Sequence, residues 1–181
     1  MLWWLCQTKL TDETLAAMNT PADHLDDSQN PILKPLYDLT QIRFERIGFV
    51  GVIRMDNPPV NPMSRTLSDE LTFALDYISE IDEVRSVVLT GEGKVFCAGA
   101  DLKGRADVIK GPGDLPAHSR RTREAFHAIR ECSKPVVAAL NGAALGAGLG
   151  MAASADVVIA SEKATIGLPE IDVGLLGGCR H

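Results

Sequence analysis

The chain has 181 residues, 45% of them hydrophobic, which is enough for one domain with a sizeable core but too short for two full domains. Its formal net charge of -6 disfavours nonspecific binding to nucleic acid or to an anionic membrane surface, because both attract basic proteins. The four cysteines are widely spaced and form no C-x-x-C pair, and the histidines show no metal-ligand spacing. These features predict a cytoplasmic protein with reduced thiols, no metal, and neither nucleic acid nor membrane as a partner.

The first 40 residues are expected to be an N-terminal extension. Met18 begins a plausible shorter chain, so residues 1–17 have the character of an upstream extension of the gene model. Residues 18–40 are rich in Pro, Asp and Asn, which predicts a flexible arm. A short helix over 12–18 is the alternative for part of this segment. The core domain is expected to span residues 41–181.

From residue 42 the pattern changes to alternating β-branched and aromatic residues around Gly48, which predicts a hairpin. Ser64 is a candidate N-cap for a helix that runs to about Ile81. The helix would place four apolar residues on one face, and this face is expected to be core: Leu67, Leu71, Leu75 and Ile78.

The middle of the chain alternates strands and helices. Residues 86–91 form a continuous β-branched run typical of a buried strand, and 104–118, rich in Gly and Pro, are expected to be a mobile loop. A helix is predicted from about Ser119 to Cys132, and Lys134-Pro135 ends it before the buried strand 135–140.

The last part continues the alternation. Small residues from Gly148 onward favour a closely packed helix, two short strands are predicted within 156–167, and Pro169 begins a turn or helix. The alternation of strand and helix predicts an α/β fold.

Three ordered segments carry a resemblance to a known family: GKVFCAGADLK at 93–103, KPVVAALNGAALGAG at 134–148 and ADVVIASEKATIGLPEIDVGL at 155–175. Together they resemble the crotonase superfamily of enoyl-CoA hydratases and isomerases over about residues 41–181. The resemblance implies the ClpP/crotonase spiral of ββα units. Family members continue beyond the point that corresponds to His181, so a C-terminally truncated member is expected.

The resemblance also implies catalytic residues. The motif match assigns the two peptide N–H groups of an oxyanion hole to Ala100 and Ala147, whose small side chains permit close approach of a thioester oxygen. It assigns proton transfer to Glu170, which neighbouring Ile166, Leu168 and Ile171 are expected to bury, raising its pKa. Hydratases of the family usually carry a second glutamate, at the position of Gly150 here. This departure favours isomerisation, or another enolate reaction with one base, over efficient hydration.

The substrate implied by the resemblance is an acyl-CoA thioester, with CoA as part of the substrate and no permanently bound cofactor. Lys94 and Lys103 match positions near the CoA phosphates, and backbone groups of Phe96 and Ala98 match the adenine-binding edge. Asp101 is expected to fix its loop by accepting backbone N–H groups. The resemblance further implies a homo-oligomer, a trimer or a dimer of trimers.

Two alternatives remain beside an enolate-forming enzyme. The first is a truncated, inactive crotonase-like protein that binds acyl-CoA or only oligomerises. The second is dinucleotide binding at the glycines of 146–150, which is disfavoured because Met151 stands where the third glycine of that fingerprint belongs.

Overall fold

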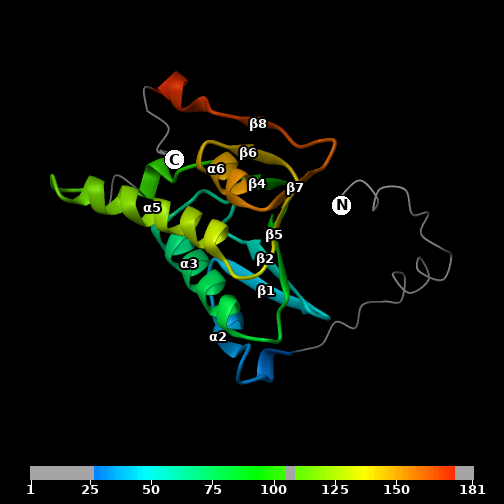
Figure 1. The fold of residues 1–181 in the computed structure, drawn as a ribbon. Helices are drawn as coiled ribbons and strands as arrows, with labels where there is room; N and C mark the ends of the chain where they lie inside the picture. The colour runs from blue at the N-terminus through cyan, green and yellow to red at the C-terminus, as the bar shows by residue number, and fades with distance from the viewer. Residues whose placement is uncertain (1–26, 105–108, 174–181) are drawn as a thin grey trace.

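The computed structural model describes residues 27–104 and 109–173, which form two sheets with helices packed against them (Figure 1). The larger sheet has the strand order β1-β2-β3-β5-β7, and the smaller has the order β4-β6-β8. The strands of the larger sheet are β1 (Ile42–Ile47), β2 (Val50–Met55), β3 (Ser86–Gly91), β5 (Val136–Leu140) and β7 (Val157–Ala160). The strands of the smaller sheet are β4 (Val95–Cys97), β6 (Ala143–Leu145) and β8 (Ile166–Gly167).

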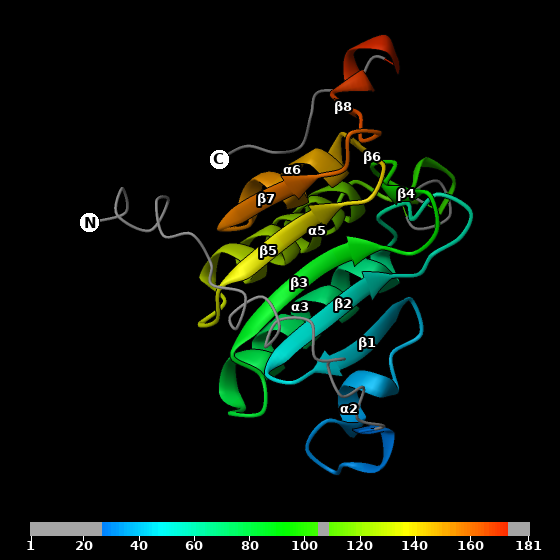
Figure 2. The same cartoon turned by 90° about the vertical axis from the view of Figure 1, so that its right-hand side faces the viewer.

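The predicted hairpin is confirmed. β1 and β2 pair antiparallel, and Gly48 turns between them with a φ of +60°, a conformation that glycine adopts readily. The other pairs of the larger sheet, β2 with β3, β3 with β5 and β5 with β7, are parallel. Parallel pairs require crossovers, and the helices of these crossovers lie behind the sheet in Figure 2. They are α3 (Arg65–Glu80), α5 (Asp114–Glu131) and α6 (Ala147–Ser154).

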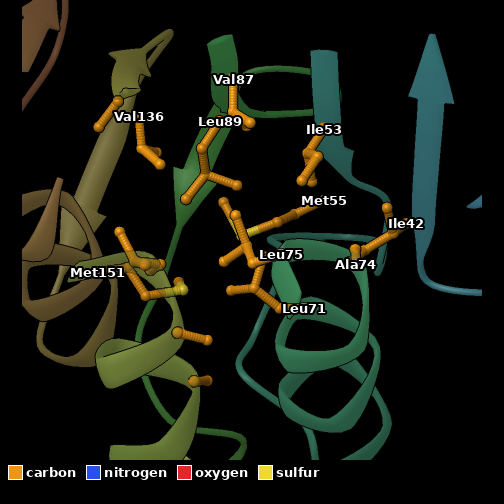
Figure 3. Packing of buried hydrophobic residues seen from close by; sticks show 14 of the residues in the cluster. Ile42, Ile53, Met55, Leu71, Ala74, Leu75, Val87, Leu89, Val136 and Met151 are labelled. Atoms are coloured by element: carbon orange, nitrogen blue, oxygen red, sulfur yellow. The ribbon is translucent and has the colours of Figure 1, made fainter. Parts of the chain in front are cut away.

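The core lies between the larger sheet and these helices (Figure 3). The apolar face predicted for the helix after Ser64 is confirmed, because all four of its residues are fully buried. Leu71 and Leu75 of α3 point toward Met55 of β2, and Met151 of α6 lies nearby. The side chain of Ser64 accepts the N–H of Leu67 at 3.0 Å, so the predicted N-cap is also confirmed.

The flexible arm expected at residues 18–40 is wrong for the part of it that the structure describes. Residues 27–40 form the 3-10 helix η1 (Asp27–Gln29) and the short helix α2 (Lys34–Tyr37). Leu33 and Leu36 are fully buried in the core, and Asp27 forms a 2.6 Å ion pair with Arg46. The Pro-, Asp- and Asn-rich composition of this segment did not indicate that Leu33 and Leu36 pack in the core. Residues 1–26 lie outside the described residues, and the division of the chain near residue 41 stays a prediction.

The helix predicted from Ser119 begins five residues earlier, at Asp114. The Asp114 carboxylate accepts the N–H groups of Lys110 and Gly111, and Pro116 falls in the first turn, where its missing N–H is tolerated. The expected loop is therefore helical over its last residues, while residues 105–108 lie outside the described part.

The edge strand β7 presents apolar side chains to solvent. Val157, Val158 and Ile159 are each about half exposed or more, and Ile166 and Leu168 further along the chain are also exposed. Single apolar residues scattered over a surface are ordinary, but these exposed side chains are neighbours along one strand. Among the residues that the structure describes, no helix combines the length and the apolar character needed to cross a membrane.

Candidate active site

The first predicted turn follows β4. Gly99 has a φ of +104°, and its carbonyl accepts the N–H of Met63 at 2.8 Å, while the N–H of Asp101 donates to the Met63 carbonyl at 3.3 Å. These two bonds form a parallel bridge between Met63 and Ala100. The N–H of Ala100 lies between them and donates to no acceptor among the described residues. The turn therefore holds one backbone donor unpaired.

The predicted structural role of Asp101 is confirmed. Its Oδ1 atom accepts the N–H of Gly104 at 2.9 Å. The carboxylate thus stabilises the chain that leaves the first turn, by the local side-chain to backbone bond that aspartate forms readily.

The second predicted turn joins β6 to α6 at Gly146, which has a φ of +52° and a ψ of −115°. Its N–H donates to Gly167 of β8 at 2.9 Å, and its carbonyl accepts the N–H of Gly150 at 3.0 Å as the helix begins. The first N–H groups of a helix have no acceptor within the helix. Accordingly, the N–H of Ala147 has no acceptor in the described part of the chain.

The two turns lie side by side because β4 and β6 are parallel neighbours. A Cβ atom added to Gly99 would lie 3.1 Å from the Leu145 carbonyl oxygen and 3.9 Å from the Ala147 nitrogen. A Cβ atom added to Gly148 would lie 2.8 Å from the Cβ of Cys97, so α6 also packs tightly on β4. The structure therefore brings together two unpaired N–H groups from segments almost fifty residues apart in the sequence.

Glu170 approaches the second turn from η2 (Pro169–Val173), the 3-10 helix that follows β8. A Cβ atom added to Gly146 would lie 3.0 Å from the Glu170 Cδ atom and closer still to Oε1. The Oε2 atom is buried and has no hydrogen-bond partner among the described residues. A buried carboxylate oxygen without a partner is costly, and such groups concentrate at functional sites.

Glu170 is only partly buried, and its burial does not arise as the sequence predicted. Ile166 and Leu168 are 65% and 61% exposed, so neither shields the carboxylate, and the side chain of Ile171 lies outside the described part. The carboxylate lies instead against the backbone of Gly146. Absence of a side chain at residue 146 creates the space that Glu170 occupies.

The residues predicted to bind CoA fall into two groups. Lys94 and Lys103 are both exposed, as a phosphate contact requires. Phe96 is fully buried in the core, and the N–H of Ala98 donates to the Val60 carbonyl at 3.0 Å. The side chain of Phe96 and the N–H of Ala98 are therefore occupied structurally.

Sequence reasoning missed two asparagines that hold the connection between β3 and β4, which leads into the first predicted turn. Asn61 has a φ of +50°, and its buried amide donates to the carbonyls of Glu92 and Val95 at 3.0 and 2.8 Å. Asn141 accepts the N–H of Gly91 at 3.2 Å and donates to the Gly93 carbonyl at 3.0 Å. An asparagine between prolines, and another at the end of a buried strand, were the available signals.

The fold and the two turns define an α/β protein of the crotonase type, with backbone donors beside a carboxylate. The chain belongs to the enoyl-CoA hydratase/isomerase family, whose model matches residues 45–180. Members of this family act on CoA thioesters.

Individual relatives agree with this assignment. The chain is 39% identical over 130 residues to a probable enoyl-CoA hydratase of Bacillus subtilis, covering 72% of this chain and 50% of the relative. It is also 39% identical over 134 residues to (7aS)-7a-methyl-1,5-dioxo-2,3,5,6,7,7a-hexahydro-1H-indene-carboxyl-CoA hydrolase of Mycobacterium tuberculosis, covering 74% of this chain and 53% of that protein. The chain therefore spans about half the length of the curated relatives it matches.

Solved structures share the fold. The crystal structure of an enoyl-CoA hydratase from Bacillus anthracis matches with a TM-score of 0.72 and 33% identity, covering 77% of this chain and 55% of that one. A structure of Pseudomonas aeruginosa DspI matches with a TM-score of 0.73 and 34% identity, covering 78% and 58%. The predicted crotonase fold is thus confirmed.

Proposed function

We propose that the protein catalyses an enolate reaction of an acyl-CoA thioester, with Ala100 and Ala147 as the oxyanion hole and Glu170 as the proton carrier. The observation that carries the proposal is the convergence of two unpaired backbone N–H groups with a carboxylate at Gly146 whose Oε2 atom is buried. The thioester oxygen would accept both N–H groups. Donors that are held in place before charge develops typically contribute about 10²–10³-fold each to the rate.

The proton balance favours isomerisation. Glu170 takes a proton from C2 of a 3-enoyl thioester, and the electron pair of that C–H bond moves toward the carbonyl oxygen to form the enolate. Glu170 then returns the proton at C4, which leaves the double bond between C2 and C3. One carboxylate is sufficient for this sequence, because the same group acts first as base and then as acid.

Hydration would require a second group to hold and activate water. The position that resemblance assigns to the second glutamate is Gly150, a buried residue of α6 whose carbonyl accepts the Ser154 hydroxyl at 2.9 Å. Glycine supplies no acid or base there. The relatives named hydrolases make thioester or carbon–carbon hydrolysis the second reaction to assay, since it also passes through a stabilised oxyanion.

The test uses the full-length protein and a panel of 2-enoyl and 3-enoyl thioesters, with isomerisation, hydration and hydrolysis monitored separately. Glu170→Gln should lose at least about a hundredfold in turnover while the Kd for the thioester changes little, because general acid–base groups contribute about 10²–10⁴-fold. The matched control is Glu162→Gln, an exposed glutamate of the same segment, which should keep wild-type turnover.

The outcomes separate the candidates. Wild-type turnover in a folded Glu170→Gln variant would show that proton transfer lies elsewhere. Thioester binding without turnover in the wild type would support the alternative of a binding protein without activity. The cytoplasmic location, the trimeric or hexameric assembly, and the CoA contacts of Lys94 and Lys103 stay predictions.

A further inference from the structure

The loop that joins β2 to α3, residues 56–64, lies along the first turn. Its Val60 carbonyl accepts the N–H of Ala98 at 3.0 Å, and Met63 forms the parallel bridge with Ala100. Met63 is only 2% exposed, so the bridge belongs to the packed part of the molecule. The loop therefore pairs with the first turn at two places.

The bridge sets the direction of the Ala100 N–H. Met63 bonds to the two neighbours of Ala100: its N–H donates to the Gly99 carbonyl at 2.8 Å, and its carbonyl accepts the N–H of Asp101 at 3.3 Å. In a parallel pair these bonds go to the residues before and after the bridged one, so the N–H of Ala100 faces away from Met63. A displacement of Met63 would therefore turn the N–H that is assigned to the oxyanion hole.

Asn61 anchors the loop between its two pairing places. Its side chain is buried and donates to the carbonyls of Glu92 and Val95 at 3.0 and 2.8 Å, while its Oδ1 atom accepts the N–H of Asn57 at 3.0 Å. Its φ of +50° is one that asparagine adopts more readily than most residues with a Cβ atom. Val95 begins β4, so one side chain joins the loop to the strand that leads into the first turn.

An oxyanion hole depends on the direction of its donors as well as on their distance. Hydrogen bonds weaken steeply when the angle at the hydrogen falls below about 120°. A displacement of about 1 Å in a catalytic group can cost about 10²-fold in rate. The bonds that hold the loop therefore bear on the rate of reaction as well as on stability.

We propose that Asn61 is a positioning residue for the oxyanion hole, because it holds the loop in the place from which Met63 directs the Ala100 N–H toward the thioester oxygen. The inference rests on the proposed function and adds to it a residue outside the site. Asn61 acts through Met63 and not by contact with the substrate, since its amide is buried and bonded within the protein.

The test uses two substitutions in the full-length protein. Asn61→Gly tolerates the positive φ but removes the amide, and Asn61→Asp keeps the shape and the acceptor for Asn57 but loses both donors. Turnover of a 3-enoyl thioester should fall about 10–100-fold in both variants. The Kd for the thioester should change little, because the donor bonds more strongly to the enolate oxygen than to the neutral thioester.

A spectroscopic measurement isolates the oxyanion hole from proton transfer. The probe is hexanoyl-CoA with an isotope label at the carbonyl, which has no double bond to move. Binding to the wild type should shift the carbonyl stretch to lower frequency, because the two N–H groups polarise the bond. In the Asn61 variants about half of this shift should be lost, since the donor at Ala147 remains.

The matched control is Ser79→Ala, near the opposite end of α3. The Ser79 hydroxyl donates to the Leu75 carbonyl at 2.9 Å and accepts the N–H of Ser133 at 3.1 Å, so its loss also removes hydrogen bonds between a side chain and the backbone. Ser79→Ala should keep the wild-type carbonyl shift and turnover. Urea unfolding of every variant establishes that the measurements are made on folded protein.

The outcomes are distinct. A full carbonyl shift and wild-type turnover in the folded Asn61 variants would refute the positioning role, and so would an equal loss in Ser79→Ala. If the wild type binds hexanoyl-CoA without any shift, the oxyanion hole of the proposed function fails, and the role of Asn61 fails with it. If neither Asn61 variant folds, Asn57→Ala takes their place, because the Asn57 amide holds the Pro62 carbonyl of the same loop at 2.9 Å. A folded Asn57→Ala should lose part of the shift, and an unchanged shift would refute the inference.

Discussion

Replacing Gly146 by alanine tests the geometry on which the candidate site depends. At a φ of +52° with a ψ of −115°, a residue with a Cβ atom is strained, which costs about 1–3 kcal/mol. The new methyl group would also overlap the Glu170 carboxylate, which is the far end of a flexible side chain and can move aside at little cost in stability. We expect Gly146→Ala to lower the free energy of unfolding by about 1–3 kcal/mol, which is on the order of 5 °C in Tm for a chain of this length, and to displace the Glu170 carboxylate.

The assay combines urea unfolding with turnover on the preferred thioester. Gly113→Ala is the matched control, because Gly113 has a φ of −81° and open space where a Cβ would stand, so its effect should stay within about 0.5 kcal/mol. The double variant Gly146→Ala/Glu170→Ala should recover only the small share that comes from overlap, but not the backbone strain. Wild-type stability and turnover in Gly146→Ala would refute both the conformation of this turn and the position of Glu170.

The remaining predictions concern stability. Ser64→Ala removes the cap of α3 and should lower the free energy of unfolding by about 1 kcal/mol, measured by urea unfolding; no change would show that the 3.0 Å bond to Leu67 contributes nothing. Burial raises the pKa of the Cys97 thiol from its ordinary value of 9.0 to about 11. Because the folded-state pKa is the higher one, the stability due to the buried neutral thiol is fully present below pH 9 and is lost as the pH rises from 9 to about 11. Between pH 9 and 11, the free energy of unfolding should fall more steeply in the wild type than in Cys97→Ala. Parallel curves for the two proteins would contradict the raised pKa of Cys97.

The sequence by itself determined the local elements whose signals are short-range. Alternating β-branched residues around Gly48 specify the hairpin, because side chains alternate between the faces of a strand. Ser64 and the 3.6-residue spacing of the leucines specify α3 for the same kind of reason. The resemblance of three ordered motifs was also enough to assign the family and to select Ala100, Ala147 and Glu170 for examination.

Only the tertiary structure decided how these residues are related in space. The pairing of β4 with β6 places the two unpaired N–H groups side by side. The contact between η2 and Gly146 buries the Oε2 atom of Glu170, which the exposed Ile166 and Leu168 do not cover. Local patterns record the preferences of neighbouring residues, whereas a site is made by long-range packing, which depends on the whole fold.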